Sequence, residues 1–172
     1  MKTIITIAMA ACALISAPAA AEVVSASPNA FHVRQSVPIA ADAASAFAIL
    51  SRPALWWSDA HTYSGDAGFF SLDLVPGGCL CETWGGGFVK HMEVVSMRPG
   101  TQIVMEGGLG PLRYVAASGT MTWEIADTET GRQFVIDYKV TGFVNGEGAQ
   151  LAGAVDGVLA EQAQSFAATV AR

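Results

Sequence analysis

The stretch LAGAVDGVLAEQAQSFAATV, residues 151–170, decides the fold of this chain. At 100° per residue its large apolar side chains fall within an arc of about 120°, whereas Asp156, Glu161 and Gln164 lie outside it. The members of the arc are Leu151, Val155, Val158, Leu159, Phe166 and Val170. The pattern predicts one amphipathic helix of ~30 Å, long enough to lie across a sheet of several strands.

One polar residue lies inside this apolar arc. Gln162 falls near its middle, where a packed core favours an apolar side chain. A buried amide without partners costs roughly 1 to 3 kcal/mol, so Gln162 is expected to contact a sheet residue such as His91 or Glu93, or a water or ligand. The helix is therefore predicted to cover a lined pocket rather than a dry core.

The residues before this helix predict an antiparallel sheet. Residues 31–39 alternate apolar and polar side chains with the period of a half-buried strand. Asp42 can cap a helix over residues 43–50, and Ser51 and Pro53 can begin a second short helix. Six further strands, separated by glycine-rich turns, are predicted at residues 69–75, 79–84, 88–97, 101–106, 116–126 and 132–143. The prediction is an α+β helix-grip fold in which a curved seven-stranded sheet wraps around the C-terminal helix.

Five motifs accompany this order of elements. They are LWWSDAHTYSG, GGCLCE, HMEVV, GGLGPL and VDGVLAEQ. With them, the chain from residue 31 onward resembles the SRPBCC superfamily, which includes START lipid-transfer domains, pollen-allergen-like proteins and polyketide cyclases, and it is similar to an exported bacterial branch. The resemblance implies a hydrophobic cavity between sheet and helix. It implies no particular reaction, because the members include carriers, sensors, cyclases and chaperone partners.

The first residues have the composition of a signal peptide. Lys2 precedes an apolar run of about a dozen residues, and Ala19 and Ala21 fit a small-residue cleavage site before Glu22. The run is shorter than the ~20 residues that span a bilayer. We expect residues 1–21 to be removed on export to the periplasm or medium. Residues 22–30 then form a leader to a single domain, residues 31–172.

Charge and composition exclude several kinds of partner. The 172 residues carry 15 acidic and 9 basic side chains, a net charge of −6, and form no basic stripe that could neutralise phosphates. We therefore expect no nucleic acid partner. The C-terminal helix has no basic flank, so we expect no stable membrane insertion. The glycines of WGGGF and GGLGP match no nucleotide-binding motif, and no cofactor is expected.

Cys79 and Cys81 are the two cysteines of the predicted domain. Two positions apart in a strand, they share a face with Cα atoms ~6.5 to 7 Å apart, at the edge of the reach of a disulfide. Zinc would need His91 and Glu82 as further ligands, but Glu82 points to the opposite face. The favoured interpretation is two small strand residues without chemistry, with no metal. A disulfide and a weak metal pair are the alternatives.

His91 and Glu93 form a candidate pair in the strand predicted at 88–97. Alternation places them on one face with Val89, Val95 and Met97, and we assign this face to the cavity. A histidine beside a carboxylate can act as a general base or form a hydrogen-bonded polar pair near the cavity mouth.

Aromatic side chains gather in the motif LWWSDAHTYSG. Trp56 and Trp57 cannot both face inward, because adjacent helical residues point about 100° apart. One is expected to fill the core, and the other to line the cavity mouth with His61 and Tyr63. The alternative is that these aromatic residues only close one end of the sheet.

The sequence thus favours the binding of a small hydrophobic or amphipathic molecule. The candidate ligand-binding residues are Trp56, Trp57, His61, Tyr63, His91, Glu93 and Gln162. A cyclase- or dehydratase-type enzyme that uses His91 and Glu93 is one alternative. A scaffold that acts through protein contacts, without a ligand, is the other.

Overall fold

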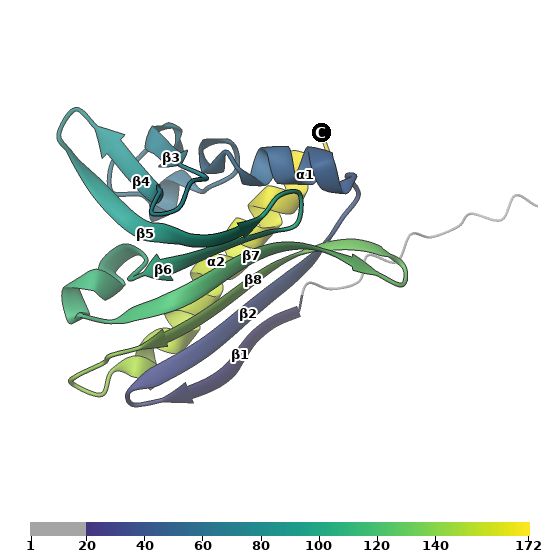
Figure 1. The fold of residues 1–172 in the computed structure, drawn as a ribbon. Helices are drawn as coiled ribbons and strands as arrows, with labels where there is room; N and C mark the ends of the chain where they lie inside the picture. The colour runs from purple at the N-terminus through teal and green to yellow at the C-terminus, as the bar shows by residue number, and fades with distance from the viewer. Residues whose placement is uncertain (1–19) are drawn as a thin grey trace, which may run out of the picture.

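The sheet of this protein is antiparallel and open, and one long helix packs on it (Figure 1). The computed structural model describes residues 20–172. The strands are β1 (Ala20–Ser27), β2 (Ala30–Ile39), β3 (Phe70–Leu72), β4 (Cys79–Trp84), β5 (Gly87–Arg98), β6 (Gln102–Gly107), β7 (Ser118–Thr128) and β8 (Gly131–Thr141). They follow the order β1-β2-β8-β7-β6-β5-β4-β3. The helices are α1 (Ala43–Leu50) and α2 (Gly148–Val170), with the 3-10 turns η1 (Pro53–Leu55), η2 (Asp59–His61), η3 (Ala67–Phe69) and η4 (Gly110–Val115).

The sheet has one strand more than the seven predicted. The seven expected strands correspond to β2–β8, and β1 pairs with the free edge of β2. The pattern missed β1 because its described side chains, from Glu22 to Ser27, are all exposed and show no alternation. The expected signal peptide, residues 1–21, lies outside the described residues except for Ala20 and Ala21, which begin β1.

The two expected short helices differ in kind. In α1, Asp42 accepts a hydrogen bond from the Ser45 amide at 2.9 Å, so the predicted cap is confirmed. The second element is the single 3-10 turn η1, and Ser51 does not cap it. The Ser51 hydroxyl instead donates to the Phe47 carbonyl of α1 at 2.7 Å, and Arg52 precedes the turn.

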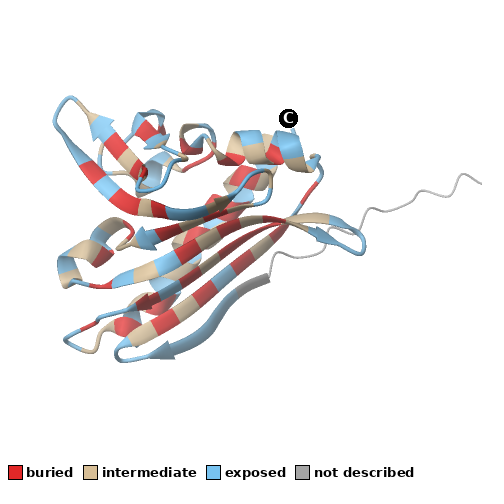
Figure 2. Ribbon diagram, viewed as in Figure 1, coloured by how far each residue is buried: buried red, intermediate tan, exposed pale blue. Residues whose placement is uncertain are grey.

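α2 packs across the sheet and fills the core with its second half. Leu159, Ala163 and Phe166 are fully buried. The Phe166 ring lies 4.3 Å from that of Phe134 in β8 and 5.4 Å from that of Trp56, measured between ring centroids. On the strands, buried and exposed residues alternate (Figure 2), which is the half-buried pattern that the sequence predicts. No helix in the described part of the chain has the length and hydrophobicity to cross a membrane.

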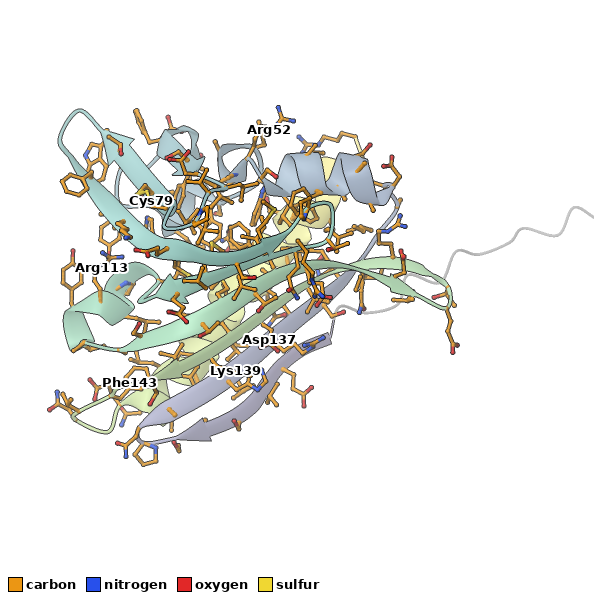
Figure 3. The ribbon with its side chains drawn as sticks, in the orientation of Figure 1. Arg52, Cys79, Arg113, Asp137, Lys139 and Phe143 are labelled. Carbon is orange, nitrogen blue, oxygen red and sulfur yellow. A yellow bond between two sulfur atoms is a disulfide. The ribbon has the colours of Figure 1, made fainter. Side chains whose placement is uncertain are left out.

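A bulge interrupts the pairing of β4 with β5. Leu80 pairs with Met92 and Cys81 pairs with Lys90, so His91 has no partner opposite it in β4. At this irregularity a disulfide joins Cys79 to Cys81, with Cα atoms 5.3 Å apart instead of the ~6.5 Å of a regular strand (Figure 3). The favoured interpretation of two cysteines without chemistry is therefore wrong, because it assumed an undistorted strand.

The disulfide should contribute little to stability. It closes a loop of only three residues, which removes little conformational entropy from the unfolded chain. Replacing both cysteines with serine should lower the melting temperature by only a few degrees. Calorimetry of the double variant measures this, and intact mass with and without reductant reports the bond. Loss of folding in reductant would contradict the prediction.

Candidate functional site

A pocket of about 480 Å³ lies beside the first half of α2. Three segments surround it: α2, the chain between η1 and β3, and η4 with the residue before it. From α2 come Leu151, Ala154, Val155 and Val158; from the second segment come Trp57, Ala60, His61, Thr62 and Tyr63; and from the third come Leu109, Gly110, Pro111, Leu112 and Val115. His91 is the lining residue of the sheet. Most of this wall is apolar.

The large apolar side chains in the first half of α2 are less buried than Leu159 and Phe166 in its second half. Leu151, Val155 and Val158 are only partly buried, although they belong to the same apolar stripe as the fully buried Leu159 and Phe166. The first three line the pocket, and Leu151 and Val155 also pack against the core. The stripe predicted from the sequence therefore continues along the whole helix, and in the first half of α2 its larger side chains line the pocket.

A buried carboxylate supports the pocket from behind. The Glu82 side chain in β4 is completely buried. It accepts hydrogen bonds from the amides of Tyr63, at 3.1 Å, and Ser64, and lies 3.2 Å from the Nε2 atom of His91. Glu82 thereby joins the chain after η2 to the bulge of β5.

Hydrogen bonding decides the ionisation of Glu82. Burial by itself raises the pKa of this carboxyl, but the donors from Ser64, Tyr63 and His91 outweigh it, and the pKa is lowered. The pKa of His91 is lowered as well, because burial disfavours its charged form more than Glu82 favours it. An ionised carboxylate only accepts hydrogen bonds, so a neutral His91 places its proton on Nε2.

The His91 ring is held between aromatic side chains. It stacks on Phe70 with ring centroids 4.8 Å apart and planes at 16°, and the Tyr63 ring lies 5.9 Å away. The imidazole is 3% exposed. Its Nδ1 atom is buried and has no hydrogen-bond partner among the described residues.

Arg113 of η4 fixes the backbone around the bulge (Figure 3). Its guanidinium donates to the carbonyl oxygens of Lys90, His91 and Gly108. Gly107 allows the close approach of β6, since a Cβ atom there would lie 2.8 Å from the His91 carbonyl oxygen and its φ is +150°. These contacts give His91 a defined position at the pocket wall.

The structure brings four of the predicted site residues together. Trp57, His61, Tyr63 and His91 all line the pocket. The Trp57 indole donates to the His61 carbonyl at 3.1 Å, which holds this part of the wall. The His61 ring is also 3.0 Å from a carboxylate oxygen of Glu161 on α2.

Trp56 and Gln162 lie elsewhere. Trp56 is 1% exposed and packs in the core against Trp123 and Phe166. Gln162 is fully buried, as the wheel predicted, but its Oε1 atom accepts a hydrogen bond from the Ser58 amide at 2.8 Å and contacts neither His91 nor Glu93. The helix pattern could not reveal this partner, because Ser58 is distant in sequence and offers a backbone group.

Glu93 does not line the pocket. The bulge at His91 makes His91 and Met92 both point inward, so the alternation is displaced and Glu93 falls on the outer face. There it forms an ion pair with Lys90. The carboxylate beside His91 is therefore Glu82, and the expected pairing with Glu93 is wrong.

Sequence reasoning overlooked Glu82 as a site residue. The alternation in residues 79–84 contains the signal, because Leu80 and Glu82 share a face and Leu80 is a core residue. The pocket residues of η4 had no comparable signal. Their position depends on contacts with β5 that are distant in sequence.

The weak metal pair finds no support. Cys79 and Cys81 are bonded to each other, so neither sulfur is a free thiolate ligand. Within residues 20–172, no group of three or more histidine, cysteine or acidic side chains is placed to hold a metal ion.

Comparison with solved structures identifies the fold. An uncharacterised protein from Rhizobium leguminosarum aligns over 83% of this chain and 97% of its own, with 17% identity and a TM-score of 0.56. The di-domain ARO/CYC StfQ of the steffimycin biosynthetic pathway aligns over 84% of this chain and 52% of its own, with 14% identity and a TM-score of 0.55. DynU16, from the dynemicin biosynthetic locus, aligns over 77% and 46%, with 19% identity and a TM-score of 0.50.

The chain shares its fold with these solved structures. No protein-family model matches the sequence, and no curated protein matches it. The likeness agrees with the α+β helix-grip architecture that the sequence predicted, with eight strands in place of seven. At these levels of identity it concerns the fold alone.

The Glu82–His91 pair predicts a stability that falls with acidification. Both groups have lowered pKa values, relative to 6.5 for His91 and 4.5 for Glu82, so the unfolded chain binds protons more readily. Stability should decrease as the pH falls below about 6.5, and further below about 4.5. Thermal unfolding across this range measures the effect.

Two matched variants test whether His91 causes the loss of stability that begins below about pH 6.5. His91→Gln removes the titrating ring and should flatten the decrease between about pH 6.5 and 5. His61→Gln removes a ring that is not bonded to Glu82, and it should keep the wild-type slope. An unchanged slope in His91→Gln would refute the assignment.

Proposed function

We propose that this protein binds a small apolar or amphipathic molecule in the pocket beside α2. The observation that supports this proposal best is the size and lining of the pocket. Its volume of about 480 Å³ is within the range of small-molecule sites. Aliphatic side chains of α2 and η4 face it, together with the rings of Trp57 and Tyr63.

A few polar groups accompany this apolar wall. They include Thr62, the Tyr63 hydroxyl and the imidazoles of His61 and His91. Tyr63 is 40% exposed and lies where the pocket meets solvent. An apolar cavity with a small number of polar groups suits a ligand that is mainly hydrophobic and has a few hydrogen-bonding atoms.

Two alternatives receive less support. The cyclase- or dehydratase-type reaction relied on His91 and Glu93 acting together, and Glu93 lies on the outer face. The protein-contact scaffold gives no role to a pocket with partly exposed aliphatic residues on its wall. Ligand binding accounts for both the pocket and the partly exposed aliphatic side chains on its wall.

Tryptophan fluorescence can test the binding of ligands. Trp57 lines the pocket and Trp56 lies next to it, with ring centroids 5.6 Å apart. Titration with fatty acids, isoprenoids or flat aromatic compounds should change the emission. Ala154→Phe should weaken binding at least tenfold, because Ala154 lines the pocket and a phenyl ring would occupy part of it.

The matched control uses the same helix. Ala154 and Ala168 are both exposed alanines of α2, but Ala168 does not line the pocket. Ala168→Phe should therefore leave affinity unchanged. Gln162→Leu should reduce stability rather than affinity, because it removes the acceptor for the Ser58 amide. If no compound from a broad apolar library binds, the proposal fails.

We also propose that the protein acts outside the cytosol. The composition of residues 1–21 supports this, and so does the Cys79–Cys81 disulfide, since such bonds persist in oxidising compartments. Expressed in a bacterium with its own leader, the protein should be recovered from the periplasm with Glu22 as its first residue. N-terminal sequencing measures this, and an intact Met1 on the recovered protein would contradict it.

A further inference from the structure

One polar atom of the pocket wall has no role in the contacts described so far. His91 lines the pocket, its imidazole is 3% exposed, and its Nδ1 atom is buried without a hydrogen-bond partner among the described residues. Leaving a buried polar atom unpaired costs free energy, so native structures rarely keep one without a reason.

The pair with Glu82 determines what this atom can do. The carboxylate accepts a hydrogen bond from the Nε2–H group of the ring, at 3.2 Å, so the neutral imidazole keeps its lone pair on Nδ1. The buried position of the ring favours this neutral form. Nδ1 is therefore a hydrogen-bond acceptor that requires a donor.

The surrounding residues supply no such donor. Phe70 stacks on the ring face, and the Tyr63 ring packs nearby. The Arg113 guanidinium is directed to the carbonyl oxygens of Lys90, His91 and Gly108. His91 is itself one of the residues that line the pocket.

We propose that His91 is the residue that determines ligand specificity: its Nδ1 atom accepts a hydrogen bond from a neutral hydroxyl group, an alcohol or a phenol, on an otherwise apolar ligand. This inference rests on the proposed binding function. Glu82 acts as a positioning residue, because it fixes the tautomer and orientation of the ring without lining the pocket. A carboxylate ligand is disfavoured, because it has no proton to donate and would lie near the ionised Glu82.

Two compounds of nearly equal shape test this inference. 2-Naphthol has a hydroxyl group where 2-methylnaphthalene has a methyl group. The affinity ratio of naphthol to methylnaphthalene should be about fivefold higher for the wild type than for His91→Gln, which corresponds to about 1 kcal/mol for one hydrogen bond. His91→Gln keeps a donor for Glu82 and replaces the Nδ1 acceptor with an amide oxygen, so a variant without any acceptor at this position is needed beside it.

Two further variants guard against a loss of folding. The double variant Glu82→Gln/His91→Phe removes the charge together with the ring, so no unpaired carboxylate is buried, and its affinity ratio should match that of His91→Gln. His32→Gln replaces a histidine of β2 that does not line the pocket, and it should keep the wild-type ratio. Melting curves establish that each variant is folded.

A nitrogen NMR measurement reports the contact directly. The Nδ1 resonance of His91 should shift when 2-naphthol is added, and it should not shift with 2-methylnaphthalene. If both compounds bind and the ratio is the same in the wild type and in His91→Gln, the inference is wrong although ligand binding stands. If neither compound nor any other apolar compound binds, both proposals are wrong.

Discussion

The apolar stripe of α2 must be covered by the sheet that residues 20–172 form, and this constraint shapes the rest of the described structure. Over the second half of the helix, Phe134 of the sheet and Trp56, which follows η1, pack on Phe166. Trp123 packs in turn on Trp56. The first half lies against the β1–β2 hairpin at Gly148 and places Ala152 in the core. Beside this half, η4 and the chain after η1 leave a space of about 480 Å³. The same apolar stripe of α2 therefore contributes side chains to both the core and the pocket.

Glu82 is a buried charged group that contacts residues of the pocket wall. A fully buried carboxylate is tolerated only with several donors, and Glu82 finds them in the amides of Tyr63 and Ser64 and in His91. Satisfying one charge therefore fixes the loop that carries Tyr63 and orients the imidazole on the pocket wall. The position of the Tyr63 loop and the tautomer of His91 both depend on this group.

The bulge shows how a local irregularity changes a site. A regular strand would place Glu93 beside His91 and the cysteines ~6.5 Å apart. One unpaired residue at His91 turns Glu93 outward, and within the same irregularity the cysteines lie close enough to bond. Two expectations from the sequence fail for this one reason, because alternation assumes an unbroken ladder.

The sequence by itself determined the elements and their class. The periodicity of residues 151–170 fixes a long amphipathic helix, and alternation fixes seven strands, because both patterns repeat within a single segment. It also indicated Trp57, His61, Tyr63 and His91. Only the tertiary structure decided that β1 completes the sheet, that the Ser58 amide donates to Gln162, and that Glu82 rather than Glu93 partners His91. Those contacts join distant segments through backbone groups and a shifted register, which leave no periodic trace in the chain.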